Sequence, residues 1–173
     1  KPAMSNNIMT IWFEIYKPSV KTLRTTPNTR TNEILIYGVS VIDIFTGHSS
    51  IFQHETPFHM NVTTFDELER YVSIYVPSEI IIISPFEDST IQTIIQYAGI
   101  QTNAIHIVNS TQKNEQVLRC TYEKYLKEVL ANFYKEDTYD VCRDFQEYIL
   151  ATQSFCYLLN FIQEHNGRLT TKI

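Results

Sequence analysis

The chain has little glycine, and the placement of the few glycines excludes one common kind of nucleotide site. Its 173 residues include 4 glycines, namely Gly38, Gly47, Gly99 and Gly167. A Walker A loop, which cradles the phosphates of a nucleotide, needs two glycines five residues apart and a Lys directly after the second. No two of these glycines have that spacing, so the sequence predicts no ATPase site among these residues.

Cysteine and histidine also lack the spacings that disulfide frameworks and metal sites require. The 3 cysteines, Cys120, Cys142 and Cys156, are odd in number and contain no C-x-x-C pair. The 5 histidines form no H-E-x-x-H pattern. We therefore predict reduced thiols in helical segments, with Cys142 and Cys156 at or near inward positions, and no metal ligands.

A net positive charge and long apolar runs are absent as well. The formal net charge is -5, whereas a domain built mainly to grip DNA must meet a dense line of phosphate charges. No apolar stretch approaches the ~20 residues that cross a bilayer, and the first residues contain no apolar signal-peptide centre. We expect a soluble, intracellular chain without membrane contacts. Because it begins at Lys1 rather than Met, we also expect it to be a piece of a larger protein.

Aromatic and β-branched residues are plentiful, and their patterns predict five strands. The chain has 11 Tyr and 10 Phe and is 43% hydrophobic, so it can fill an aromatic-rich core. Apolar runs predict strands over residues 8–16, 33–44, 49–54, 79–84 and 104–108. The first three strands form an antiparallel meander. The last two are apolar throughout, so helices must cover both faces of the sheet.

Helical periodicity predicts four helices between and after these strands. Apolar residues three and four apart predict helices over residues 64–75, 88–98, 112–133 and 139–164. Thr64 and Glu67 form a capping box at the start of the first helix. The segment Asp88-Ser89-Thr90 provides a cap for the second helix, and Gly99 stands where that helix ends in a left-handed residue.

The order of these elements predicts the fold class. Three strands in a meander, then alternating helices and strands, favour an α/β fold of the ribonuclease-H-like type. We expect a mixed sheet of about five strands with helices on both faces, plus a C-terminal helical extension. The predicted domain covers residues 1–150, and residues 151–173 form a helix that leads out of it.

This fold class raises the hypothesis of a metal-dependent nuclease, which gathers carboxylates at one sheet edge to hold two Mg²⁺ ions about 4 Å apart. The candidate carboxylates are Glu14, Asp43, Asp66 or Glu67, and Glu87 or Asp88. Glu14, however, lies near the end of its strand rather than at the centre, and the other acids suit capping or turn roles. The pattern therefore predicts no catalytic, cofactor-binding or metal-binding residue.

Four basic residues gather in the Thr- and Pro-rich segment that follows the first strand. They are Lys17, Lys21, Arg24 and Arg30. Such a cluster is a candidate contact for a phosphate backbone or an acidic partner. A solvated loop over residues 17–32 is the alternative, which the acidic balance of the chain favours.

Three ordered motifs resemble the connector domain of the MutS family of DNA mismatch-recognition ATPases. The first is the strand and Thr-Gly turn from Tyr37 to Gly47, and the second is the Pro-opened strand from Val76 to Ile83. The third is the closing helix with Tyr157-Leu-Leu-Asn-Phe-Ile162. The chain departs from the family at Phe45 and His48, where the family usually has Ser and an acidic residue.

The resemblance implies a non-catalytic connector that links the mismatch-reading part of a parent protein to its lever and ATPase parts. The helix after residue 150 would lead toward the lever domain. ATP and Mg²⁺ would bind in the missing ATPase domain, and no cofactor would bind in this fragment. The implied partners are the remaining domains, a MutL-type protein that docks on the connector, and mismatched double-stranded DNA held through the parent protein. The parent would form a dimer through the missing domains.

Two other functions remain open from the sequence. The chain could be a metal-dependent nuclease of ribonuclease-H-like fold, or a protein interaction module that docks partners by its aromatic-rich face.

Overall fold

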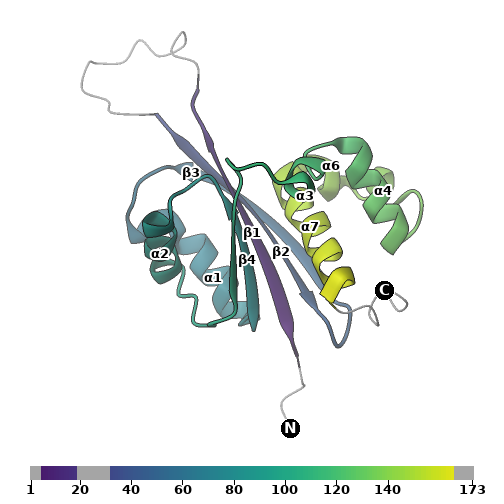
Figure 1. Ribbon diagram of the computed structural model, residues 1–173, viewed down its shortest axis with the longest axis horizontal. Coiled ribbons are helices and arrows are strands. Elements are labelled where there is room, and N and C mark those ends of the chain that lie inside the picture. The colour runs from purple at the N-terminus through teal and green to yellow at the C-terminus, as the bar shows by residue number, and fades with distance from the viewer. Residues whose placement is uncertain (1–4, 19–31, 166–173) are drawn as a thin grey trace.

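A computed structural model describes residues 5–18 and 32–165, which form one five-stranded sheet with helices on both sides (Figure 1). The strands are β1 (Asn7–Tyr16), β2 (Ile34–Asp43), β3 (Ser49–Pro57), β4 (Glu79–Ser84) and β5 (Ile105–Asn109). Their order across the sheet is β3-β2-β1-β4-β5. The five predicted strands are confirmed, with ends shifted by a few residues at most.

The sheet is mixed, as the sequence predicts. β1 pairs with β2 and β2 with β3 in antiparallel fashion, which completes the meander. β4 pairs with β1 and β5 with β4 in parallel fashion, so each of these strands follows a crossover helix. This arrangement is the ribonuclease-H-like fold, and the predicted fold class is confirmed.

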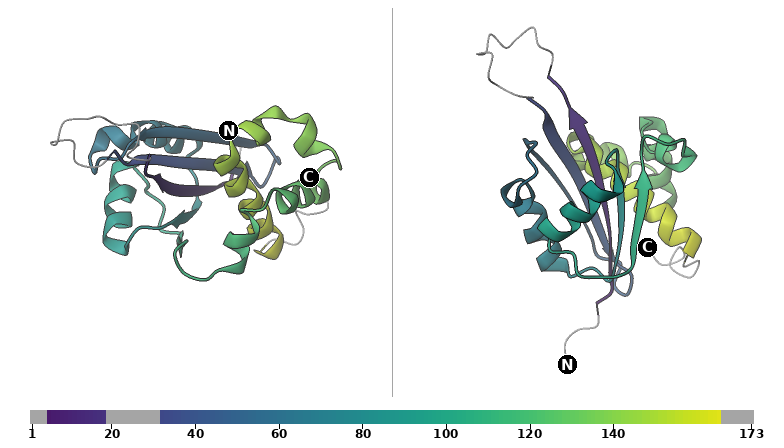
Figure 2. Two further views of the ribbon diagram at one scale, coloured as in Figure 1. Left: turned by 90° about the horizontal axis from the view of Figure 1, so that it is seen from above. Right: turned by 60° about the vertical axis from the view of Figure 1, so that its left-hand side comes forward.

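The two faces of the sheet carry separate cores. Met9, Ile11 and Phe13 of β1 face α1 (Asp66–Tyr75) and α2 (Asp88–Tyr97). Ile8 and Trp12 point the other way, toward a helical layer made of α3 (Glu115–Arg119), α4 (Glu123–Phe133) and α7 (Ile149–His165). The right-hand view of Figure 2 shows the two helical layers on opposite sides of the strands.

The helix predictions need four corrections. Asn61, not Thr64, caps the first helical segment: its Oδ1 accepts from the backbone N of Thr64, and a 3-10 turn, η2 (Val62–Phe65), precedes α1. The segment predicted as one helix over 112–133 breaks between α3 and α4. The segment over 139–164 is three helices, α5 (Thr138–Val141), α6 (Arg143–Glu147) and α7. The N-cap residue of α2 is Glu87, which makes no side-chain capping bond, so the predicted cap at Asp88-Ser89-Thr90 is wrong. In contrast, Gly99 has φ +66° after α2, as predicted.

The helix α7 begins in very close contact with the middle of β2. A Cβ atom on Gly38 would overlap backbone atoms of Leu150 and Ala151, so only glycine fits beneath the first turn of α7. Beside it in the sheet, Gln53 of β3 directs Oε1 at the same turn and accepts from the N–H groups of Leu150 (2.9 Å) and Ala151 (3.1 Å). The strands β2 and β3 therefore provide both the space and a cap for α7.

α7 covers the sheet, and the predicted division of the chain at residues 150 and 151 stays a prediction. Within residues 5–18 and 32–165, no helix has the length and apolarity needed to span a membrane.

We expect Gly38→Ala to destabilise the fold strongly, because the added methyl group meets backbone that cannot rotate away. The expected loss in the free energy of unfolding is about 3 kcal/mol or more, measured by urea denaturation. Gly47→Ala is the matched control: Gly47 has φ +79° but nothing lies within 4 Å of its Cβ position. It should lose only about 1 kcal/mol, from backbone strain. Equal losses would contradict the close approach of α7.

Two buried hydroxyl groups lie next to each other on neighbouring strands. Thr10 of β1 and Ser40 of β2 are directly paired in the sheet, and both residues are 0% exposed. Within the described residues, neither Thr10 Oγ1 nor Ser40 Oγ has a hydrogen-bond partner. A buried polar group without a partner lowers stability.

We therefore expect Thr10→Val to raise the free energy of unfolding by about 1 kcal/mol, because the replacement has the same shape and removes the desolvated hydroxyl. Thr152→Val on α7 is the control, since Thr152 Oγ1 lies 2.9 and 2.8 Å from the carbonyl oxygens of Phe145 and Tyr148. That variant should lose about 1 kcal/mol. Thermal unfolding of both variants checks the opposite signs.

Candidate functional site

A pocket opens where the parallel strands end, on the face of the sheet that carries α3 and α7. In open α/β sheets, ligands bind outside the carboxyl ends of the strands. The pocket has a volume of about 370 Å³. The floor is Trp12 of β1, which is 2% exposed and meets Tyr157 of α7 edge to face. We call it the carboxyl-end pocket.

Most of the polar groups around this pocket come from the loop between β5 and α3. Glu14 reaches it from β1, and the other polar lining residues are Ser110, Gln112, Lys113, Asn114, Glu115 and Thr121. The pocket therefore combines two carboxylates, several neutral oxygen donors and one Lys. This combination suits a ligand that carries phosphate groups and a hard cation.

Local hydrogen bonds fix the loop that supplies these groups. The Asn109 side-chain oxygen accepts from the backbone N (2.8 Å) and the hydroxyl (2.6 Å) of Thr111, which closes a tight turn. The Ser110 N–H donates to the carbonyl of Ser84 at 2.8 Å and so joins the loop to the end of β4. Asn114 caps α3 by accepting from the N of Val117 at 3.1 Å.

The two carboxylates of the pocket differ in their surroundings. Partial burial raises the pKa of the Glu14 carboxyl above its usual value of 4.5, although the residue as a whole is exposed. Glu115 lies in the first turn of α3 and forms a long ion pair with Arg119, 3.7 Å between Oε2 and Nη2. Both residues are exposed, and the Glu115 side chain is 75% accessible to solvent.

The other candidate carboxylates of the sequence do not join Glu14. Asp43 ends β2 opposite Asn7, at the far end of β1. Asp66 and Glu67 begin α1 on the other face of the sheet. Glu87 and Asp88 lie at the start of α2, which covers that same face. In the described part of the chain, no three His, Cys, Asp or Glu residues come together as metal ligands.

The basic cluster falls mostly outside the described residues. Lys17 is described, and its Nζ pairs with Glu33 Oε1 at 3.2 Å. Lys21, Arg24 and Arg30 lie outside the described residues, so their role as a phosphate or partner contact stays a prediction.

The three cysteines form no disulfide, and two of them are buried. Burial raises the pKa of Cys120 to about 12, and the pKa of Cys156 is raised as well, so neither thiol is a ready nucleophile. Cys142 is half-buried between α5 and α6. These positions agree with structural thiols in the helical layer.

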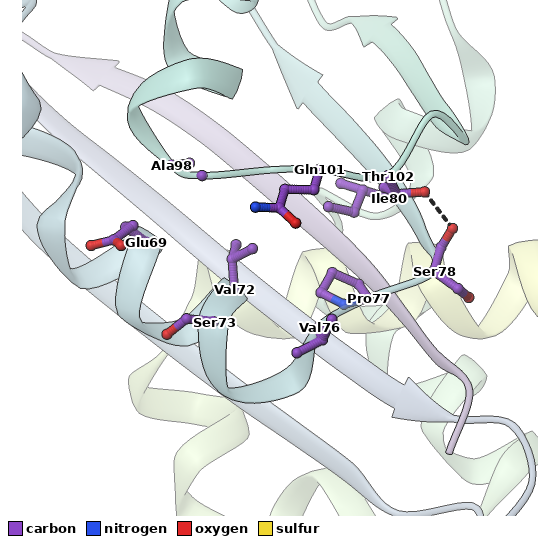
Figure 3. A pocket seen from close by; sticks show the side chains of 11 residues that line it. Glu69, Val72, Ser73, Val76, Pro77, Ser78, Ile80, Ala98, Gln101 and Thr102 are labelled. Atoms are coloured by element: carbon purple, nitrogen blue, oxygen red, sulfur yellow. Dashed lines mark hydrogen bonds between the residues drawn. The ribbon is translucent and has the colours of Figure 1, made fainter. Parts of the chain in front are cut away.

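A second hollow lies at the opposite end of the strands, where β4 begins. It has a volume of about 590 Å³ and lies between the end of α1, the start of β4 and the turn after α2 (Figure 3). Its apolar lining residues are Val72, Val76, Pro77, Ile80 and Ala98, and its polar lining residues are Glu69, Ser73, Ser78, Gln101 and Thr102. We call it the amino-end groove.

The carboxyl-end pocket is lined by two carboxylates, which is enough for one Mg²⁺ ion and too few for two. Mg²⁺ in proteins is often held by one or two carboxylates, with water and substrate phosphates in the remaining positions. Glu14 and Glu115 supply that number, while a two-metal centre needs more acids than the described residues bring together.

Comparison with known proteins gives matches among solved structures. No family model matches the chain, and no curated protein matches it. Among solved structures, the chain is similar to the crystal structure of the fowlpox virus Holliday junction resolvase, with a TM-score of 0.46 and 11% identity. The match covers 91% of this chain and 99% of that chain. So remote a likeness assigns no activity to this chain.

The comparisons correct the resemblance to the MutS family. Neither comparison of sequences finds a MutS protein, and the structure found is that of a resolvase. The prediction of a MutS connector domain is therefore wrong, together with mismatch repair, ATP binding and an ATPase parent. The physical reason is that a strand ending in a Thr-Gly turn and a Pro-opened buried strand serve the sheet itself, and a fold does not carry one function.

The partners and the absence of activity are corrected with it. The MutL-type protein, the mismatched DNA and the dimer through missing domains followed from the MutS resemblance and fall with it. The expectation that these residues are not an enzyme also followed from the MutS resemblance and is corrected with it; the solved structure found is described as a Holliday junction resolvase.

Sequence reasoning missed most of the carboxyl-end pocket. It selected Glu14 but not Lys113, Asn114 or Glu115, because residues 112–133 were predicted as one continuous helix. The signal that could have found them is Asn114, a helix N-cap residue three positions before Val117. The amino-end groove was also missed, since Val76 and Pro77 were assigned to a strand opening.

The Asp43 carboxylate gives a prediction for pH dependence. Desolvation raises its pKa, but hydrogen bonds from the backbone N of Phe45 (3.0 Å) and Asn6 (3.2 Å) outweigh it and hold the pKa below the usual 3.8. A depressed pKa stabilises the fold above the unfolded-state pKa, and the contribution disappears as the pH falls through the folded-state pKa. Asp43→Asn should thus cost stability at pH 7 and progressively less below pH of about 4. Urea unfolding of both proteins across this range measures the difference, and a constant difference would contradict the assignment.

Proposed function

We propose that this chain is a metal-dependent nuclease that cleaves phosphodiester bonds at the carboxyl-end pocket. The observation that supports the proposal is the meeting of Glu14 from β1 with Glu115 and Lys113 from the β5–α3 segment around one pocket. The pocket lies at the carboxyl ends of the parallel strands, where this class of sheet offers its ligand site. This proposal departs from the expectation that no cofactor binds within these residues.

Glu14 and Glu115 would hold a Mg²⁺ ion, and the fit rests on their two carboxylates and on the neutral oxygens of Ser110 and Asn114. When bound, such an ion supplies a Lewis acid that polarises a phosphoryl oxygen. The residues of the chain orient the substrate: Lys113 contributes a positive charge toward a phosphate oxygen, and Trp12 closes the floor against water.

The acidic balance of the chain limits how the substrate is held. A net charge of -5 gives little general attraction to nucleic acid. The proposal therefore relies on local contacts at the pocket, in which the cation offsets the repulsion between the carboxylates and the phosphate.

Incubation of the full chain with labelled nucleic acids and Mg²⁺ or Mn²⁺ tests the proposal. The substrates are a four-way DNA junction, a linear duplex and a single strand. We expect metal-dependent cleavage that Glu14→Gln lowers on the order of 100-fold, because the variant keeps the shape of the side chain but loses its charge. Glu115→Gln should lower the rate as well, and Lys113→Ala should mainly raise KM.

Glu79→Gln is the matched control. Glu79 is a carboxylate at the opposite end of the sheet, where it pairs with His106 at 2.7 Å, and its variant should cleave at the rate of the original chain. Absence of cleavage with every substrate and both metals, or activity that survives Glu14→Gln, would overturn the proposal.

A further inference from the structure

Val76, at the lip of the amino-end groove, has a backbone conformation that its side chain disfavours. It ends α1 with φ 43° and ψ 62°, and its N–H donates to the carbonyl of Val72 at 2.8 Å. Left-handed geometry is a genuine outlier for a β-branched residue, and the following Pro77 restricts the position further. Gly or Asn would suit this helix end better. The chain nevertheless carries Val there.

The Val76 side chain gains nothing from burial within the described chain. It is 75% exposed, and Ile74, in the same last turn of α1, is 65% exposed. Behind Val76, the wall of the groove is formed by the buried residues Val72, Pro77 and Ile80 (Figure 3). A strained residue that projects an apolar side chain into solvent beside an apolar hollow is a feature of a contact surface.

Hydrogen bonds hold the walls of the groove in place. Thr102 Oγ1 donates to the carbonyl of Ser78 at 2.6 Å and links the two sides. Asn7 Nδ2 donates to the carbonyl of Tyr75 at 2.7 Å, which fixes the end of α1 against β1. A surface that is already ordered loses little conformational freedom when a partner binds.

The charges around the groove define the chemistry of the occupant. Glu69 is the charged residue of the lining, and the lining contains no Lys, Arg or His. Its Cγ lies 3.4 Å from the position of a Cβ on Gly99, so the carboxylate stands at the rim above that glycine. Asp66 lies three residues before it on the same helix, whereas Glu67 pairs with Arg70 at 3.4 Å. A cation on the partner would meet complementary charge here.

We propose that the amino-end groove docks a protein segment in which an apolar side chain is followed within about one helical turn by a Lys or Arg. The apolar side chain enters the hollow beside Val76, and the cation reaches Glu69. A second copy of the chain is a poorer occupant, because two surfaces of net charge -5 repel each other. This docking surface lies at the other end of the strands from the carboxyl-end pocket. The proposal does not depend on the proposed nuclease activity.

Phage display tests the proposal: random 12-residue peptides are selected for binding to the full chain. One selected peptide is then labelled, and its affinity is measured by fluorescence anisotropy. The selected sequences should pair a Leu, Met, Ile or Phe with a nearby Lys or Arg. Val76→Ala should weaken binding at least about tenfold, since it removes a central apolar contact. Glu69→Gln should weaken it a few-fold and reduce its dependence on salt, and Glu69→Lys should abolish it.

Val141→Ala is the matched control, because Val141 on α5 is 73% exposed and lies outside the groove. Its binding should equal that of the original chain. Val76→Gly separates docking from folding: relief of the left-handed strain should raise the urea midpoint while affinity falls. If Val76 had a purely structural role, the urea midpoint and the peptide affinity of Val76→Gly would fall together or both stay unchanged.

Three results would overturn the proposal. They are selected peptides that are acidic or lack an apolar residue, binding that survives Val76→Ala, and the failure of any peptide to bind. Self-association in sedimentation that disappears with Val76→Ala would also overturn the assigned occupant and make the groove an interface between two copies.

Discussion

The close contact between α7 and β2 is the constraint on which the rest of the structure depends. Gly38 removes the side chain that would separate helix from strand, and Gln53 satisfies the N–H groups that the first turn of α7 leaves open. Because α7 then lies flat on the meander, its buried residues fill one core, and α4 packs against its outer side. The position of Tyr157 against Trp12, and hence the floor of the carboxyl-end pocket, follows from this seating.

The two ends of the sheet have opposite surface chemistry. At the carboxyl ends of β1, β4 and β5, the chain gathers carboxylates, amides and a Lys around a small pocket. At the amino end of β4, it gathers Val, Pro and Ile around a larger groove with a single acid at the rim. The rigid sheet keeps these two surfaces apart, so a ligand at one need not disturb the other.

The strands could be predicted well from the sequence, whereas the sites could not. Runs such as Ile80 to Ile83 admit one interpretation, because a short apolar run with Pro before it suits a strand buried on both faces. The region after residue 110 was harder, since the periodicity of α3 and α4 continues across the break at Cys120 to Tyr122 and hides it. The loop that builds the carboxyl-end pocket falls in that region. The left-handed backbone of Val76 could not be predicted for another reason, because nothing in the sequence indicates it.

The order of the chain has a consequence for how the protein folds during synthesis. The Gln53 side chain caps a helix turn that lies 98 residues further along the chain. The apolar face of the first three strands therefore leaves the ribosome well before α7, the helix that covers it. At usual translation rates of about 5–20 residues per second, this interval lasts on the order of several seconds. Until α7 is synthesised, the nascent chain therefore exposes an apolar β-surface to which a cotranslational chaperone could bind.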